Sequence, residues 1–254
     1  MDSEDRRILF MKLIPVVVII IVILSIVFLI IVSSNKKYII LGNYLIYEKG
    51  KFSYKQVNEI SDEVTKFKYD VYDGKKVLKD VRMEYLNNRF YLYTKKGVYI
   101  NETSFRVATH GVKVKLADYN KQSVYNVTND NYILKFLDKV NIKDKNYYSG
   151  YYTAYDFDKD GKDELVYTIN NFSLGNPDYK QYGFMFIVQN EEIVYYTDIA
   201  DSDVYTVMDI VDLDNDGKYE LIVNKGNKDL KTFDGCYQVY NLKRGSWKIT
   251  NDCE

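Results

Sequence analysis

One acidic pattern occurs twice in the second half of the sequence. Residues 156–165 read DFDKDGKDEL and residues 212–221 read DLDNDGKYEL, so both copies match D-x-D-x-D-G-x-x-E-L. Carboxylates at alternate positions direct their oxygens into one concavity, and the glycine permits the sharp turn that closes it. Calcium takes about six to eight oxygen ligands, and this spacing supplies them. The pattern predicts two cation sites. The alternative is a pair of acidic turns without a metal.

The surroundings of both copies argue against an EF-hand. An EF-hand requires a glutamate at the twelfth loop position and a helix on each side. The twelfth positions here are Tyr167 and Val223, and β-branched and aromatic residues follow each loop. Such residues indicate strands. The acid stands instead at the ninth position, as Glu164 and Glu220.

An acid at the ninth position of a loop between two strands resembles the calcium loops of FG-GAP/VCBS repeats, which lie within the blades of a β-propeller. The resemblance covers about residues 150–254 and implies calcium as the cofactor. In the first loop it implies the side chains of Asp156, Asp158, Asp160 and Glu164 and the backbone carbonyl of Lys162 as ligands. In the second loop the implied ligands are the side chains of Asp212, Asp214, Asp216 and Glu220 and the carbonyl of Lys218.

The composition predicts an all-β fold around these loops. The chain has 27 Tyr, 12 Phe and only 2 Pro in 254 residues, which favours strands. Turn signals such as Asp-Gly at 73–74 indicate antiparallel sheet, and apolar spacing predicts one short helix at 132–140. We expect an N-terminal β subdomain at 38–117 and the calcium-loop repeats at 118–254. The β domain is expected to be propeller-like, as a closed four-bladed propeller or an incomplete arc.

A long apolar segment precedes the β domain. Residues 13–32 carry no charge, and as a helix they would span about 30 Å, the thickness of a bilayer core. The segment predicts a single transmembrane helix that acts as a signal-anchor; the alternative is a cleaved signal peptide. Basic residues are slightly more frequent before it, which favours a cytoplasmic tail at 1–12 and an extracytoplasmic C-terminal domain. The expected localisation is the cell membrane, with a single pass.

The two cysteines fit the same expectation. Cys236 and Cys253 are the only cysteines, and a pair near the end of an exported domain predicts a disulfide. Two unpaired thiols are the alternative. The abundance of Lys, Asn, Ile and Tyr suggests an AT-rich, bacterial genome.

Several function classes lack support in the sequence. The net charge of −1 provides no basic field for nucleic acid, and no glycine-rich phosphate motif indicates nucleotide binding. One histidine and two distant cysteines exclude a zinc site. That histidine, His110, has no nucleophile signature around it and is expected on the surface or in a turn. Because the clustered acids are accounted for as calcium ligands, we predict that the protein is not an enzyme.

The sequence thus predicts a membrane-anchored, extracytoplasmic binding module in which calcium is structural. Its partner is expected to be a protein or a glycan. One alternative is a surface-anchored hydrolase that uses a pair of carboxylates. The other is a structural subunit of a cell-envelope assembly.

Overall fold

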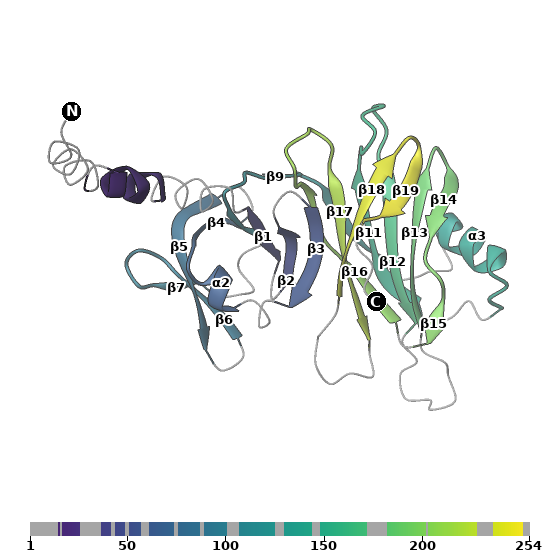
Figure 1. Cartoon of the computed structure of the whole chain (residues 1–254). Coiled ribbons are helices and arrows are strands. Elements are labelled where there is room, and N and C mark those ends of the chain that lie inside the picture. The colour runs from purple at the N-terminus through teal and green to yellow at the C-terminus, as the bar shows by residue number, and fades with distance from the viewer. Residues whose placement is uncertain are drawn as a thin grey trace, which may run out of the picture.

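The computed structural model describes most of the chain after residue 36 and a short part before it. It describes residues 15, 17–25, 37–41, 44–48, 51–56, 61–73, 76–86, 89–100, 107–124, 130–143, 148–171, 182–201, 203–227 and 236–250. Three antiparallel sheets, here named A, B and C, contain all the described strands (Figure 1).

Sheet A has eight strands in the order β3-β2-β1-β8-β4-β5-β6-β7. Its strands are β1 Tyr38–Leu41, β2 Tyr44–Glu48, β3 Lys51–Gln56, β4 Lys68–Asp73, β5 Lys76–Leu86, β6 Arg89–Tyr93, β7 Tyr99–Ile100 and β8 Val107–His110. The β4–β5 pair is the hairpin that Asp-Gly at 73–74 predicts. Figure 1 shows the sheet curving around the short helix α2 (Ser61–Val64). The Tyr69 hydroxyl donates to the Val64 carbonyl at 2.8 Å, which ties this helix to β4.

Sheets C and B contain the acidic loops. Sheet C has the order β10-β11-β12-β13-β14, with β15 paired to β13, and sheet B has the order β19-β18-β17-β16-β9. The strands of sheet C are β10 Asn120–Val124, β11 Tyr148–Tyr155, β12 Glu164–Asn171, β13 Tyr182–Gln189, β14 Glu192–Tyr196 and β15 Ala200–Asp201. Those of sheet B are β9 Lys115–Leu116, β16 Asp203–Asp212, β17 Glu220–Asn227, β18 Cys236–Lys243 and β19 Ser246–Ile249.

Strands β11–β14 and β16–β19 form two equivalent units. Each is a four-stranded antiparallel meander, with its acidic loop between the first and second strands. We call β11–β14 the first unit and β16–β19 the second unit. Each unit ends in a tight hairpin, closed by the pair Gln189 and Glu192 in one and by Lys243 and Ser246 in the other. The units therefore correspond strand for strand.

One segment links the two units at their first strands. Leu116 of β9 pairs with Val211 of β16, and Asn120 of β10 pairs with Ala154 of β11. The segment that begins the predicted calcium-loop region at residue 118 thus contains β10, which pairs with the first strand of the first unit. Its backbone groups are satisfied by sheet pairing.

The core consists of layers. One apolar cluster fills the concave side of sheet A around α2, a second lies between sheets A and B, and a third lies between sheets B and C. A fourth cluster lies beneath helix α3 (Asn131–Lys139) on the outer face of sheet C. This helix confirms the one predicted at 132–140. Asp130 caps it by accepting from the backbone N–H of Tyr132 and Ile133 at 2.9 and 3.1 Å.

The predicted transmembrane helix is wrong. Among the described residues, no helix is both long and apolar enough to cross a membrane. Residues 17–25 of the predicted span are described and helical. The remainder of 13–32 except Pro15, and the tail at 1–12, lie outside the described residues. The predicted signal-anchor, single-pass cell-membrane localisation, extracytoplasmic topology and membrane partner depended on that helix and are corrected with it.

The propeller-like arrangement is also wrong. Propeller blades are arranged radially around a channel, and about four or more are needed for closure. Here the described strands form stacked layers, and the two units bury one face of sheet B against one face of sheet C. The strands before residue 111 form one curved sheet without an acidic loop. The all-β, antiparallel class is correct, but no closed propeller is formed by the described strands.

Candidate metal sites

The first loop connects β11 to β12 and is held by its own carboxylates. The two carboxylate oxygens of Asp156 accept from the backbone N–H of Asp160 at 3.1 Å and of Gly161 at 3.0 Å. Asp158 Oδ1 also accepts from Asp160 N–H, and Asp160 Oδ1 accepts from Lys162 N–H at 2.8 Å. Gly161 has a φ of +88°, a conformation that glycine adopts readily. These bonds hold the acidic side chains on the inner side of the turn.

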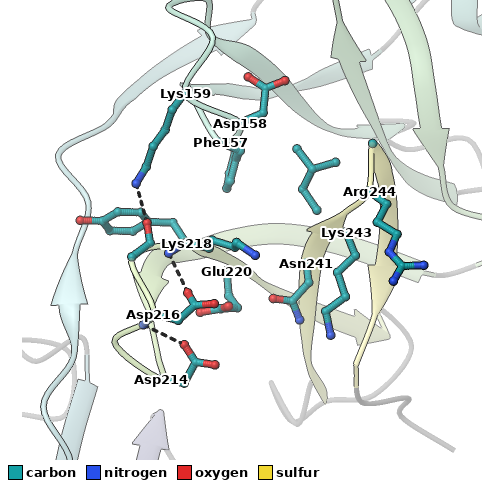
Figure 2. Close-up of a pocket in the computed structure, with 14 residues that line it drawn as sticks. Phe157, Asp158, Lys159, Asp214, Asp216, Lys218, Glu220, Asn241, Lys243 and Arg244 are labelled. Carbon is teal, nitrogen blue, oxygen red and sulfur yellow. Dashed lines mark hydrogen bonds between the residues drawn. The ribbon is translucent and has the colours of Figure 1, made fainter.

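The second loop repeats this arrangement between β16 and β17. Asp212 Oδ2 accepts from Gly217 N–H at 3.1 Å, and Gly217 has a φ of +86°. Figure 2 shows the next two bonds: Asp214 Oδ1 accepts from Asp216 N–H at 3.2 Å, and Asp216 Oδ1 accepts from Lys218 N–H at 2.7 Å. The two loops therefore share a backbone conformation as well as a sequence pattern.

A buried glutamate closes each loop. Glu164 Oε2 accepts from Phe157 N–H at 2.8 Å, and Glu220 Oε2 accepts from Leu213 N–H at 2.9 Å. Only 2% of Glu164 and 4% of Glu220 is exposed. Burial is the main cause that raises the pKa of Glu164 to about 7 and that of Glu220 to about 8; the backbone N–H opposes this rise, and the neighbouring aspartates add to it.

Burial and nearby carboxylates also raise the pKa of Asp214.

The structure brings most of the predicted ligands together. Carboxylate oxygens within 4.8 Å of one another come from Asp156, Asp158 and Glu164 in the first loop and from Asp212, Asp214 and Asp216 in the second. Asp160 and Glu220 lie outside these two groups. The backbone carbonyls of Lys162 and Lys218 remain predicted ligands.

One buried carboxylate oxygen in the second loop lacks a hydrogen-bond partner among the described residues. Asp212 is 0% exposed, and its Oδ1 atom has no hydrogen-bond partner among the described residues. Its other oxygen, Oδ2, accepts from Gly217 and lies 3.9 Å from Lys115 Nζ. Because buried carboxylate oxygens are nearly always hydrogen-bonded or metal-bound, a cation is the partner that this position fits.

Two residues that are not predicted ligands also make contacts with the loops. Gln189 Nε2, at the end of β13, donates to Asp158 Oδ2 at 2.7 Å. Lys159 Nζ in the first loop donates to the Gly217 carbonyl of the second at 2.7 Å, as Figure 2 shows. Sequence reasoning missed both residues, since no local signal connects positions that far apart in the chain.

The two cysteines and the histidine that the sequence analysis considered are not part of the acidic loops. Cys236 at the start of β18 is disulfide-bonded, and Cys253, the other half of the predicted pair, lies outside the described residues. His110, which was expected on the surface or in a turn, is half-buried and ends strand β8 among aromatic rings. Its Nδ1 atom lies 2.8 Å from the Lys68 carbonyl oxygen, and the centroids of the His110 and Phe67 rings are 4.5 Å apart. These contacts give His110 a packing role in sheet A.

The fold and the site define an all-β protein in which two equivalent four-stranded units each carry an acidic loop. Comparison with protein-family models, with curated proteins and with solved structures finds no match for this chain. The functional assignment therefore rests on the geometry of the two loops.

Proposed function

We propose that each loop binds one Ca²⁺ ion and that the two ions stabilise a β-repeat module whose function is recognition. The observation that carries the proposal is the buried Oδ1 atom of Asp212, which has no partner among the described residues, in a loop where Asp214 and Asp216 place carboxylate oxygens within 4.8 Å of one on Asp212. The first loop has the same backbone bonds and the same closing glutamate, and this correspondence extends the assignment to it.

The chemistry of the donors favours calcium over other metals. Each loop offers carboxylate oxygens, with a backbone carbonyl as a further predicted ligand, and such oxygens suit hard cations. Zinc would require nitrogen or sulfur ligands, and magnesium demands near-ideal octahedral geometry while keeping several waters. Calcium tolerates the irregular set that these loops present, and its charge would offset the mutual repulsion of the aspartates.

A recognition module fits the acidic groups better than a hydrolase does. Glu164, Asp214 and Glu220 have raised pKa values, which in a hydrolase would suggest a general acid. All three belong to the loops, and both glutamates accept a backbone N–H within their own loop. Calcium ligation and loop closure account for their position. We propose a protein or a glycan as the partner of the module.

A calorimetric calcium titration of the full chain tests the metal sites. We expect two ions per chain for the parent. Asp156→Asn and Asp212→Asn should each lose one ion, because each removes a charged ligand from one loop while preserving its shape. Asp163→Asn is the matched control, since Asp163 is exposed in the first loop and is not a candidate ligand. Failure of the parent to bind calcium at millimolar concentration would refute the proposal.

A further inference from the structure

A cavity of about 580 Å³ opens between the two loops and the turn that joins β18 to β19 (Figure 2). Small-molecule sites typically have volumes of about 300–1,000 Å³. The charged side chains on its wall are Asp158, Asp214, Asp216 and Glu220 together with Lys159, Lys218, Lys243 and Arg244. Asn241 adds a polar group that is only 7% exposed, and its Nδ2 atom donates to Thr250 Oγ1 at 3.3 Å. The Asn241 carbonyl oxygen can still accept from a ligand.

The corresponding place in the first unit is closed by its own turn. Gln189 Nε2 donates to Asp158 Oδ2 at 2.7 Å, and Lys162 Nζ donates to Asn190 Oδ1 at 3.4 Å. The cavity left beside this turn is about 260 Å³. In the first unit the turn therefore contacts the loop directly and leaves less room for a ligand.

The second unit keeps the turn but changes its side chains. Asn190 and Glu191 have φ values of +49° and +67°, and Arg244 and Gly245 have +52° and +74°, so both hairpins use the same two-residue turn. By strand register Lys243 stands where the first unit has Gln189, and Arg244 stands where it has Asn190. Lys243 and Arg244 are exposed and make no ion pair with a described residue. Two cations thus replace two amides that close the loop.

We infer that this cavity binds a small molecule carrying a sulfate or phosphate ester, and that binding requires calcium in the loops. The first part rests on the cavity and its cations, and the second rests on the proposed calcium sites. The Arg244 guanidinium presents a planar fork of donors that matches such an oxyanion, and Lys243 adds a second charge beside it. The hydrogen bond from Lys159 Nζ to the Gly217 carbonyl connects the first loop to the second loop, and both of these residues line the cavity.

The charges near the cavity explain the calcium requirement. The eight candidate side-chain ligands are carboxylates, and in the absence of a cation their field repels an incoming anion. Two Ca²⁺ ions together with the four cations of the wall would offset those eight charges. The site as a whole would then be neutral rather than strongly negative, and Lys243 and Arg244 would be the charges that contact the anion.

Calorimetric titration of the full chain with glucose 6-sulfate, glucose 6-phosphate and glucose tests the inference. The first two probes distinguish the ester, and glucose reports binding that does not depend on charge. The test variant is Lys243→Gln with Arg244→Asn, which copies the turn of the first unit and suits its backbone, because asparagine tolerates positive φ. Lys248→Gln is the control, since Lys248 is an exposed cation on the same hairpin but does not line the cavity.

In millimolar calcium we expect at least one ester to bind the parent and glucose not to bind. The double variant should weaken binding about tenfold or more, the loss expected for a charge-assisted contact, while still binding two calcium ions. Chelator should abolish ester binding, and Lys248→Gln should bind like the parent. A parent that takes up calcium but neither ester would overturn the inference and leave the calcium proposal intact. Equal losses in the double variant and in Lys248→Gln would overturn it as nonspecific attraction. Ester binding that persists in chelator would overturn the calcium requirement.

Discussion

Glu164 and Glu220 occupy equivalent positions in their loops. Each is buried, and each accepts a hydrogen bond from the backbone N–H of the residue that follows the first aspartate of its loop. Burial raises the pKa of Glu164 to about 7 and that of Glu220 to about 8. An unfolded chain would return both groups to an ordinary pKa near 4.5. The folded protein without calcium therefore binds more protons than the unfolded chain between about pH 4.5 and 8.

This difference sets the direction of a pH effect. Because the folded pKa values are raised, the calcium-free protein should become more stable as the pH falls from 8 to about 5.5. Thermal melts in chelator across this range should show the melting temperature rising by a few degrees, since about 1 kcal/mol shifts it by 2–4 °C in a protein of this size.

Glu164→Gln with Glu220→Gln should flatten the profile, since glutamine does not titrate. In saturating calcium the trend should reverse, because calcium binds the deprotonated carboxylates and competes with protons. A parent whose calcium-free stability increased with pH over this range would contradict the pKa assignment.

Each loop turns through two residues of positive φ, of which the second is a glycine. Gly161 and Gly217 have φ values of +88° and +86°, in a region that other residues rarely adopt. An added Cβ at Gly161 would meet no atom within 4 Å, and at Gly217 only Lys159 Nζ at 4.0 Å. Substitution at these positions would therefore strain the backbone rather than the packing.

Gly161→Ala and Gly217→Ala should each destabilise the protein by about 1 kcal/mol or more. Urea denaturation in chelator would measure this effect separately from metal binding. Gly226→Ala is the matched control, because Gly226 lies in strand β17 without a positive φ and a Cβ there would approach only the Val204 carbonyl, at 4.0 Å. This control should leave stability unchanged or raise it slightly. Equal losses at all three positions would argue against a special loop conformation.

Contacts between the two units link the acidic loops to the core between sheets B and C. Trp247 of β19 packs edge to face against Phe157 of the first loop, with ring centroids 4.8 Å apart. Phe157 N–H donates to Glu164, so the indole lies beside a residue held by a predicted ligand. Lys159 provides the second connection through the Gly217 carbonyl. Calcium binding to the first loop should therefore alter the surroundings of Trp247 in the second unit.

Trp247 is the only tryptophan in the chain, and its fluorescence reports this contact. Calcium titration should change its emission because ligation of Glu164 would shift the Phe157 backbone and the ring beside the indole. The change should disappear in Asp156→Asn and persist in Asp163→Asn. An emission spectrum that stays constant while calorimetry shows calcium binding would rule out this coupling.

The sequence by itself determined the features that depend on near neighbours. The acids from Asp156 to Glu164 and from Asp212 to Glu220 are spaced so that a turn at the glycine brings most of them together, and the spacing alone shows this. The strands around the loops and helix α3 follow from local side-chain patterns in the same way.

Only the tertiary structure decided how these elements meet. Stacking of sheet B on sheet C, instead of radial blades, depends on which apolar faces find one another across distant parts of the chain. The same stacking places Lys159 on Gly217 and leaves an open cavity beside Lys243. The predicted membrane span is not found among the described helices, because apolar composition permits a span without fixing the length of a helix. Contacts between residues far apart in the chain leave no local sequence pattern, and for that reason only the tertiary structure determines them.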